Sequence, residues 1–348
     1  MSNITPAQAH ARLMERLKAA HAPLLPLLSG RPLHYLDVPM HGNVGDLLIM
    51  AGTLKFFETH RLTPTRSAMY FNYDASWARS GDVLVFHGGG NFGDIYGPFQ
   101  AFREHLIAKR PDCRIVVMPQ SLHFEDPAAF ERCRAVCAGH PDLHICVRDE
   151  HSRLVAQQLT EHVYLMPDMA HQLWPLRRTQ QGQGVLHLRR RDGEAAAGGS
   201  GAASGSFDWD DLIGPGWRFT LRQIERVVTQ AGRRLGAQGL FGNWFAHWWQ
   251  QRADRIMQRA VALFSRYERV ESDRLHAHIL SCLLAMPHRV DDNSYGKNSR
   301  YIAAWTHASP LVELNAGARR AGPVPQGPAD EAAGTPVHAA AATGGAGA

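Results

Sequence analysis

The sequence predicts an α/β protein with parallel β-sheets, and three features of the chain support this class. Short apolar runs such as VLVF and HICV alternate with helical stretches, as in parallel sheets that are covered by helices on both faces. A polar or glycine-rich segment follows almost every run, where ligands of such sheets bind. At 348 residues, the chain is long enough for two domains of about 150 residues with a cleft between them.

The N-terminal segment 1–27 is predicted to be a helix. Thr5 can cap it, Pro6 suits its first turn, and Pro23 follows its end. We expect this helix to pack on the first domain. PLHYLDVP, HGNVGD and LLIMAGTLKFFETH then form the first strand, turn and helix. Further strands are predicted in GDVLVFHGGGNFGD, CRIVVMPQSLHF, HICVRDEHSRLVAQQL and VYLMPDMAH.

A break near residue 180 divides the chain into a first domain, 28–178, and a second domain, 179–314. The second domain is predicted to contain the strands GVLHLRRRD, ERVESD and HRVDD, together with two long helices and the shorter helix RLHAHILSCLLAM. Within it, the Gly/Ala-rich insert 194–206 resembles a flexible loop. The Ala/Gly/Pro tail 315–348 has few large apolar residues, so we expect it to be disordered.

Composition restricts the cellular setting and the partners. The net charge of +5 comes almost entirely from arginine, since the chain has only four lysines. Arginine favours anionic substrates or an anionic membrane surface, whereas the absence of a basic block disfavours nucleic acid. No apolar run could span a bilayer or serve as a signal peptide, so we expect a cytoplasmic protein. The five scattered cysteines predict buried thiols and neither disulfides nor a metal site.

Two glycine-rich turns follow strands in the first domain. In GNVGD, which contains Asn43 and Asp46, backbone N–H groups and a helix N-terminus could bind an anion, but an ordinary tight turn explains the motif equally well. HGGGNFGD is the stronger signal, because Gly89, Gly90 and Asn91 follow a buried strand directly. Some group is expected to approach that bare backbone closely.

Charged residues follow the next strands of the first domain. Arg148 is predicted to bind an anion, whereas Asp149 could be either a functional carboxylate or a helix N-cap. Asp168 is a possible general acid or base, or else a loop carboxylate bound to backbone N–H groups. Five further polar residues at these strand ends are candidates for binding a second ligand: Asn43, Asp46, Asp94, Gln120 and His123.

The second domain offers a further anion site. Arg274 lies at the start of a predicted helix, where exposed backbone N–H groups would add to its charge. His276 follows close to the helix start and is a candidate for function, whereas His278 is more typical of a core histidine. Lys297, in a polar loop after the last predicted strand, could bind the same anion or be an ordinary exposed lysine.

Taken in order, GNVGD, HGGGNFGD, PQSLHF, VRDEHS, PDMAH, DRLHAHIL and NSYGKNSRY resemble the polysaccharide pyruvyltransferase family. The resemblance runs from about residue 36 to 301. It implies two Rossmann-like domains, similar to those of the GT-B glycosyltransferases, with the active site in the inter-domain cleft. It also implies transfer of the pyruvyl group of phosphoenolpyruvate to a sugar as a ketal, in exopolysaccharide biosynthesis.

By motif match, the family's anion-binding arginine falls on Arg148, and its RLH element on Arg274, Leu275 and His276. The closing segment departs from the family pattern around Lys297. Phosphoenolpyruvate would be a co-substrate, and the reaction requires neither a cofactor nor a metal. We expect phosphoenolpyruvate to contact Arg148, Arg274, Leu275, Gly89, Gly90, Asn91 and Lys297, with catalytic roles for His276, Asp168 and Asp149.

The acceptor implied by this resemblance is a lipid-linked oligosaccharide or polysaccharide at the inner face of the cytoplasmic membrane. We assign its binding to the five polar strand-end residues Asn43, Asp46, Asp94, Gln120 and His123. One predicted helix could bring the enzyme there, because it carries aromatic and then basic residues; the alternative is that its aromatic residues belong to the core. The residues are Trp244, Phe245, Trp248, Trp249, Arg252, Arg255 and Arg259. Two other functions remain open: a glycosyltransferase that uses a nucleotide sugar, and a non-catalytic subunit that binds sugars or anions.

Overall fold

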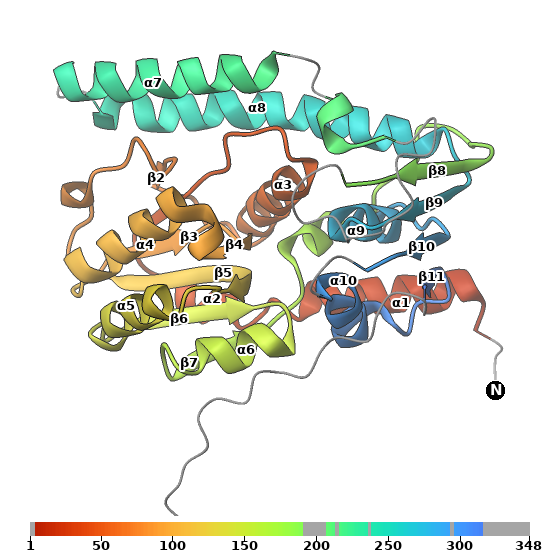
Figure 1. The fold of residues 1–348 in the computed structure, drawn as a ribbon, viewed down its shortest axis with the longest axis horizontal. Helices are drawn as coiled ribbons and strands as arrows, with labels where there is room; N and C mark the ends of the chain where they lie inside the picture. Colours follow the sequence, from red (N-terminus) through yellow and green to blue (C-terminus); the bar gives the residue numbers. More distant parts are fainter. Residues whose placement is uncertain (1–3, 191–206, 213–215, 236–237, 293–295, 316–348) are drawn as a thin grey trace, which may run out of the picture.

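Two parallel sheets form the framework of the molecule (Figure 1). The computed structural model describes residues 4–190, 207–212, 216–235, 238–292 and 296–315. The first sheet has the strand order β2-β1-β3-β5-β6-β7, and the additional strand β4 also pairs with β5. Its strands are β1 (Leu33–Leu36), β2 (Arg66–Ser67), β3 (Val83–Phe86), β4 (Gly89–Gly93), β5 (Arg114–His123), β6 (Leu143–Val147) and β7 (His162–Leu165).

The second sheet has the order β11-β10-β9-β8, and every pairing that the structure describes in both sheets is parallel. The predicted α/β class with two parallel sheets is therefore confirmed. The predicted boundary near residue 180 lies between the last strand of the first sheet and the first of the second. The strands are β8 (Val185–Leu188), β9 (Arg269–Ser272), β10 (His288–Val290) and β11 (Val312–Leu314), the last of which was not predicted.

The helices α3 (Val44–Thr59) and α9 (Leu275–Leu283) begin at the cleft and pack into the core. A β-carbon on Gly52 of α3 would lie 2.0 Å from the carbonyl oxygen of Met169, so only glycine permits this approach to the segment after β7. The remaining helices are α1 (Pro6–Ala19), α2 (Leu24–Leu28), α4 (Gly97–Lys109), α5 (Pro127–Ala138), α6 (Glu150–Ala156), α7 (Trp217–Leu235), α8 (Gln238–Ser265) and α10 (Lys297–Tyr301).

The first helix, α1, begins as predicted and packs on the second domain as well as on the end of the first. Thr5 and Gln8 form a reciprocal capping box at its start. Its apolar residues Leu13, Met14 and Leu17 cluster with Cys282 of α9, and Figure 1 shows α1 beside β11. The expectation that this helix packs on the first domain is met in part, since Lys18 donates to the carbonyl oxygen of Trp174 at 3.0 Å and accepts from the amide of Gln172 at 2.9 Å; the helix packs on both domains. An apolar stripe predicts that a helix is covered, but not by which part of the chain.

The long helices α7 and α8 run together along one edge of the molecule (Figure 1). Phe245 and Trp249 of α8 are buried in the core, and the indole N–H of Trp249 donates to the carbonyl oxygen of Pro39 at 2.5 Å. Trp248 contacts Arg252 through a cation–π interaction, and Trp244 is exposed. The core alternative is thus confirmed for Phe245 and Trp249, which leaves Trp244 at the surface.

None of the helices in the described ranges is long and apolar enough to cross a bilayer. All five cysteines are free and buried, as the sequence predicted. The Gly/Ala insert 194–206 and nearly all of the tail 315–348 lie outside the described residues. Within the tail, Asn315 is described, and its amide donates to Asp291 at 2.6 Å.

Candidate active site

A cleft of about 440 Å³ lies where the two domains meet, a size typical of small-molecule sites. The strand ends of the first sheet and the start of α3 form one side, and the start of α9, the start of α10 and one face of α7 form the other. The lining residues from the first domain include His41, Asn43, Asp46, Tyr70, Phe71, Gly90, Asn91, Tyr96, Phe99 and Arg148. Those from the second include Arg190, Trp209, Leu221, Arg222, Glu225, Arg274, Leu275, His276 and Lys297.

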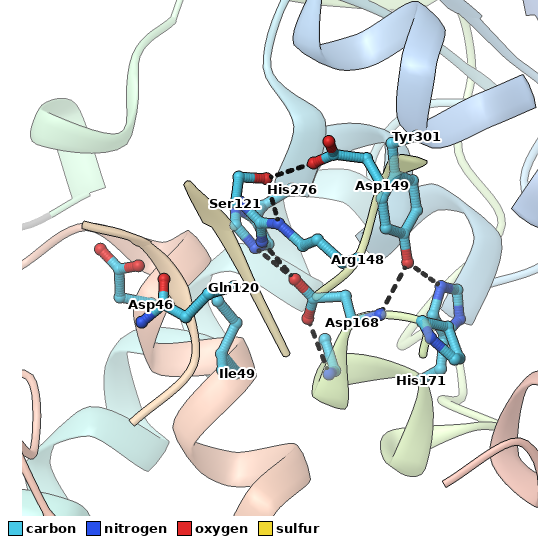
Figure 2. A network of polar contacts seen from close by, with 12 residues as sticks. Asp46, Ile49, Gln120, Ser121, Arg148, Asp149, Asp168, His171, His276 and Tyr301 are labelled. Carbon is cyan, nitrogen blue, oxygen red and sulfur yellow. Dashed lines mark hydrogen bonds and ion pairs between the residues drawn. The ribbon is translucent and has the colours of Figure 1, made fainter. Parts of the chain in front are cut away.

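Arg148 is the central cation of this cleft. Its side chain is fully buried, and Nη1 donates to Oδ2 of Asp168 at 2.6 Å while Nε donates to Oγ of Ser121 at 2.9 Å (Figure 2). Nη2 is also buried but has no hydrogen-bond partner. Because an unsatisfied buried N–H is costly, this nitrogen is poised to bind an anion that enters the cleft.

Asp168 holds both Arg148 and His276. Its Oδ2 lies 3.3 Å from Nε2 of His276, and its Oδ1 accepts from the backbone N–H of Ala170 at 2.9 Å. Burial by itself would raise the pKa of Asp168, but the hydrogen bond and charge of His276, together with Arg148, hold that pKa well below its usual range. Asp168 is therefore a fixed anion that orients its two neighbours.

His276 lies at the start of α9, directly against the start of α3. A β-carbon on Gly45 would be 2.4 Å from Nδ1 of His276. Glycine is therefore needed at position 45 because the imidazole of His276, from the other domain, leaves no room for a side chain there. This contact and the bond to Asp168 hold the imidazole from two sides, with the ring at the cleft surface.

The glycines after β3 leave room for the cations. A β-carbon on Gly90 would lie 2.6 Å from Nζ of Lys297 and 3.1 Å from Nη2 of Arg148. The next residue, Asn91, is fixed because its Oδ1 accepts from Arg103 at 2.6 Å and from Gln120 at 3.0 Å. The predicted close approach to this bare backbone is thus found, and two cations of this chain make it.

Arg274 precedes α9 and is largely buried. Its Nη2 donates to Oδ2 of Asp208 at 2.7 Å, and its backbone N–H donates to Oγ of Ser272 at 3.1 Å. Asp208 therefore orients Arg274 much as Asp168 orients Arg148. Two arginines, each paired with a buried carboxylate, line the cleft from opposite domains.

Asp46 is the carboxylate of the first domain that lines the cleft. Its Oδ2 accepts from the amide of Asn43 at 2.9 Å and lies 3.5 Å from Nε2 of His41. Asn43 also caps α3 through the backbone N–H of Gly45. Gly89 backs this carboxylate, since a β-carbon there would lie 3.2 Å from Oδ1 of Asp46.

Comparison with known proteins identifies the family of the protein that carries this cleft. The model of the family described as polysaccharide pyruvyl transferase matches residues 43–295. The chain is 38% identical over 288 residues to EpsO of Bacillus subtilis, which is named as a pyruvyl transferase, with 80% of this chain and 87% of EpsO covered. The chain belongs to the polysaccharide pyruvyl transferase family.

A more distant sequence relative and a solved structure are also similar to this chain. Pyruvyl transferase 1 of Schizosaccharomyces pombe is 27% identical over 293 residues, which cover 79% of this chain and 70% of that protein. The crystal structure of an uncharacterised protein from Klebsiella pneumoniae superposes with a TM-score of 0.53 at 18% identity, over 90% of this chain and 99% of that one. That similarity shows the fold alone. The two-domain, Rossmann-like arrangement is the one expected from the sequence.

Most residues assigned to phosphoenolpyruvate line the cleft of this family member. Arg148, Arg274, Leu275, Gly90, Asn91 and Lys297 do so, together with His276, Asn43 and Asp46. The family match ends at residue 295 and so excludes Lys297, yet the structure brings the amine of Lys297 next to Gly90. Gly89 does not line the cleft and instead supports Asp46.

Besides Asp168, which is buried behind Arg148 and His276, four other predicted site residues do not line the cleft. Asp149 accepts from Ser121 at 2.8 Å and from the backbone of Ser152 at 2.8 Å, so it is the N-cap of α6, one of the two alternatives. Gln120 supports Asn91 from behind, and Asp94 accepts from two backbone N–H groups of the segment after β5. His123 lies 3.4 Å from Glu125. These residues shape the loops around the cleft, so direct acceptor contacts are not expected from them.

Several residues of this family site were missed. Arg103 binds Asn91 and also forms a buried ion pair with Asp37, which has a positive φ of 62°. Tyr301 accepts from the backbone N–H of Asp168 at 3.0 Å and lies 2.9 Å from Nε2 of His171 (Figure 2). Arg103 lies in the middle of a helix and Tyr301 at the end of a short one, where nothing local marks either as functional.

His278, Cys282 and His288 form a buried group of metal-binding residue types, whose ligand atoms all lie within 4.8 Å of one another. Nδ1 of His278 is only 2.7 Å from Nε2 of His288, and Thr306 lies 2.9 Å from its other nitrogen. The two rings are hydrogen-bonded to each other and to the protein. This agrees with the prediction that His278 is a core residue.

The anionic state of Asp168 predicts a pH-dependent stability. Because its pKa is lowered in the folded chain, the stabilisation is present above its unfolded pKa of about 4 and is lost as the pH falls towards the folded value. The Asp168→Asn variant should therefore be much less stable than the wild type near pH 7, and the difference should shrink below about pH 4. Thermal unfolding of both proteins between pH 3 and 7 measures this, and a constant difference would contradict it.

Proposed function

We propose that this enzyme transfers the pyruvyl group of phosphoenolpyruvate to a sugar of a lipid-linked polysaccharide precursor as a ketal. Membership of the family supports pyruvyl transfer to polysaccharide. The observation that carries the choice of donor is the buried, unpartnered Nη2 of Arg148, which faces the bare backbone of Gly90 beside Lys297. A small, highly anionic donor supplies the acceptor oxygens that this nitrogen lacks.

The cations of both domains would divide the donor between them. Phosphoenolpyruvate carries a phosphate and a carboxylate, and Arg148, Arg274 and Lys297 converge on the cleft. Asp208 and Asp168 hold the two guanidinium groups in place before the donor arrives. Preorganised charge of this kind stabilises the negative charge that develops on a departing phosphate.

Ketal formation needs one proton at C3 of the donor and removes one proton from each of two hydroxyl groups. We assign the proton donor to His276, which lies at the cleft surface and is held by Asp168. Protonation of C3 makes C2 electrophilic, and the first hydroxyl attacks it. Phosphate then leaves with its electron pair and the second hydroxyl closes the ring, so that the two hydroxyl protons balance the new methyl proton and the proton on phosphate.

Asp46 is a better candidate than Asp149 or Asp168 for the base that deprotonates an acceptor hydroxyl. Asp149 caps a helix outside the cleft, and Asp168 is already bound to Arg148 and His276. Asp46 lines the cleft and lies on the first turn of α3, close to both Gly89 and the start of α9. We therefore propose Asp46, in the GNVGD turn, for this role in place of Asp149 or Asp168.

The membrane location is part of the same proposal. A lipid-linked acceptor would place the enzyme at the inner face of the cytoplasmic membrane, in peripheral contact with it. Trp244 of α8 and Phe219 of α7 are 64% and 68% exposed, and Arg222 and Arg226 are exposed on α7. Exposed aromatic residues beside arginines are suited to anionic headgroups.

The decisive experiment measures phosphate release from phosphoenolpyruvate by the purified enzyme. We expect release only when membranes carrying lipid-linked oligosaccharides are added, and co-sedimentation of the enzyme with those membranes. Phosphoenolpyruvate alone should raise the melting temperature, because it binds the native state. No release, together with a thermal shift caused by nucleotide sugars in place of phosphoenolpyruvate, would favour a glycosyltransferase. Ligand binding without any turnover would favour a non-catalytic subunit.

A further inference from the structure

The cleft has a second wall that the donor does not use. Tyr70 and Phe71 follow β2, and Phe99 begins α4; all three line the same cleft as Arg148 and His276. Across from them, Leu221, Arg222 and Glu225 of α7 complete the lining. A three-carbon anion held by the arginines would leave this part of the cleft unfilled.

The aromatic rings form a compact platform. The centroids of Tyr70 and Phe99 are 4.7 Å apart with an interplanar angle of 51°, and those of Tyr70 and Phe71 are 5.3 Å apart at 88°. Tyr96 continues the cluster towards solvent and is 40% exposed. Half-buried aromatic residues gathered in a polar cleft mark a surface that a ligand covers.

Polar groups are positioned beside this platform. The hydroxyl of Tyr70 donates to Oε1 of Glu225 at 2.5 Å, which joins the platform to α7. Arg222 lies one turn away on the same helix and lines the same cleft. A carboxylate and a guanidinium can accept from and donate to adjacent hydroxyl groups, while the negative face of an aromatic ring attracts the C–H groups of a pyranose.

We propose that Tyr70, Phe99 and Glu225 form the subsite that binds the acceptor sugar. The apolar face of a pyranose ring would stack on Tyr70 and Phe99, with its hydroxyl groups bound by Glu225 and Arg222. The hydroxyl pair that is to be bridged would then face Asp46 and the donor. This inference rests on the proposed function, since it names the chemistry of the acceptor, but binding of a sugar can be measured without the donor.

The experiment is saturation-transfer NMR with methyl hexopyranosides of different stereochemistry, on the full chain without donor. We expect saturation of the ring C–H protons for at least one hexoside in the wild type, and at least tenfold weaker binding in Tyr70→Ala and in Glu225→Gln. Tyr70→Phe keeps the ring but loses the hydrogen bond to Glu225, so its affinity for the hexoside should lie between that of the wild type and that of Tyr70→Ala. Val227→Ala removes an exposed apolar residue of α7 that does not line the cleft and should bind as the wild type does.

The thermal shift by phosphoenolpyruvate separates this inference from the proposed function. Variants that keep that shift but lose the hexoside support the subsite. Unchanged hexoside binding in both Tyr70→Ala and Phe99→Ala would overturn it, as would wild-type protein that binds none of the hexosides. Saturation of uridine that depends on Tyr70 would instead assign the platform to a nucleobase. If Tyr70→Ala does not fold, Phe99→Ala provides the same test from α4.

Discussion

Replacing Arg148 by alanine should lower phosphate release from phosphoenolpyruvate by about 10³-fold. The side chain supplies Nη2, a buried N–H donor at the cleft for which a hydrogen-bond partner is lacking. It also neutralises Asp168 at 2.6 Å. Steady-state kinetics with a membrane acceptor would measure the loss. The matched control is Arg153→Ala, which removes a partly exposed arginine paired with Glu150 on α6 and should leave the rate unchanged.

Loss of folding must be distinguished from loss of function in this variant. Removing Arg148 leaves the buried Asp168 carboxylate without its main partner, which typically costs about 3–5 kcal/mol of stability. The double variant Arg148→Ala, Asp168→Asn removes that charge and should recover much of the stability. It should nevertheless remain inactive. Near wild-type activity in either protein would contradict the role of Arg148 as the anion-binding residue.

The Gly45→Ala variant should be folded but about 10²-fold less active. The added methyl group would lie 2.4 Å from Nδ1 of His276, so the imidazole or the start of α3 must move. A displacement of about 1 Å at a reacting group is enough for a loss of this size. The same kinetic assay, together with a melting curve, measures both effects.

Gly97→Ala is the control for this substitution. Gly97 also lies at a helix start, but a β-carbon there meets no atom within 4 Å. It should therefore retain wild-type activity. A Gly45→Ala protein that is as active as Gly97→Ala would show that the position of His276 against α3 is not required for turnover.

Much of the first domain could be predicted because its determinants are local. Continuous apolar runs such as Val83–Phe86 form buried strands, and the turns after them bring Gly90 and Arg148 to one edge of the sheet. Asn43 caps its helix and lines the cleft, as its place between a strand and a helix indicates. The residue types and the strand order together were sufficient here.

The parts that were missed depend on contacts between distant segments. Arg274 could be recognised, but its partner Asp208 lies 66 residues earlier, just after the Gly/Ala insert. The platform residue Tyr70 and its partner Glu225 are 155 residues apart. No local periodicity connects such pairs. The proposed donor site consists of residues at strand ends and helix starts that local sequence indicates, whereas the proposed acceptor wall requires knowledge of which helix crosses the cleft.

The packing of α1 also determines when the molecule can be completed. His10 forms hydrogen bonds 2.8 Å long with Ser309 and with the carbonyl oxygen of Cys282, across separations of 299 and 272 residues. The ribosome makes this helix well before the segments around Cys282 and Ser309 that His10 contacts. These two contacts of α1 can therefore form only after the second domain has been synthesised, which makes them among the least local contacts of the fold.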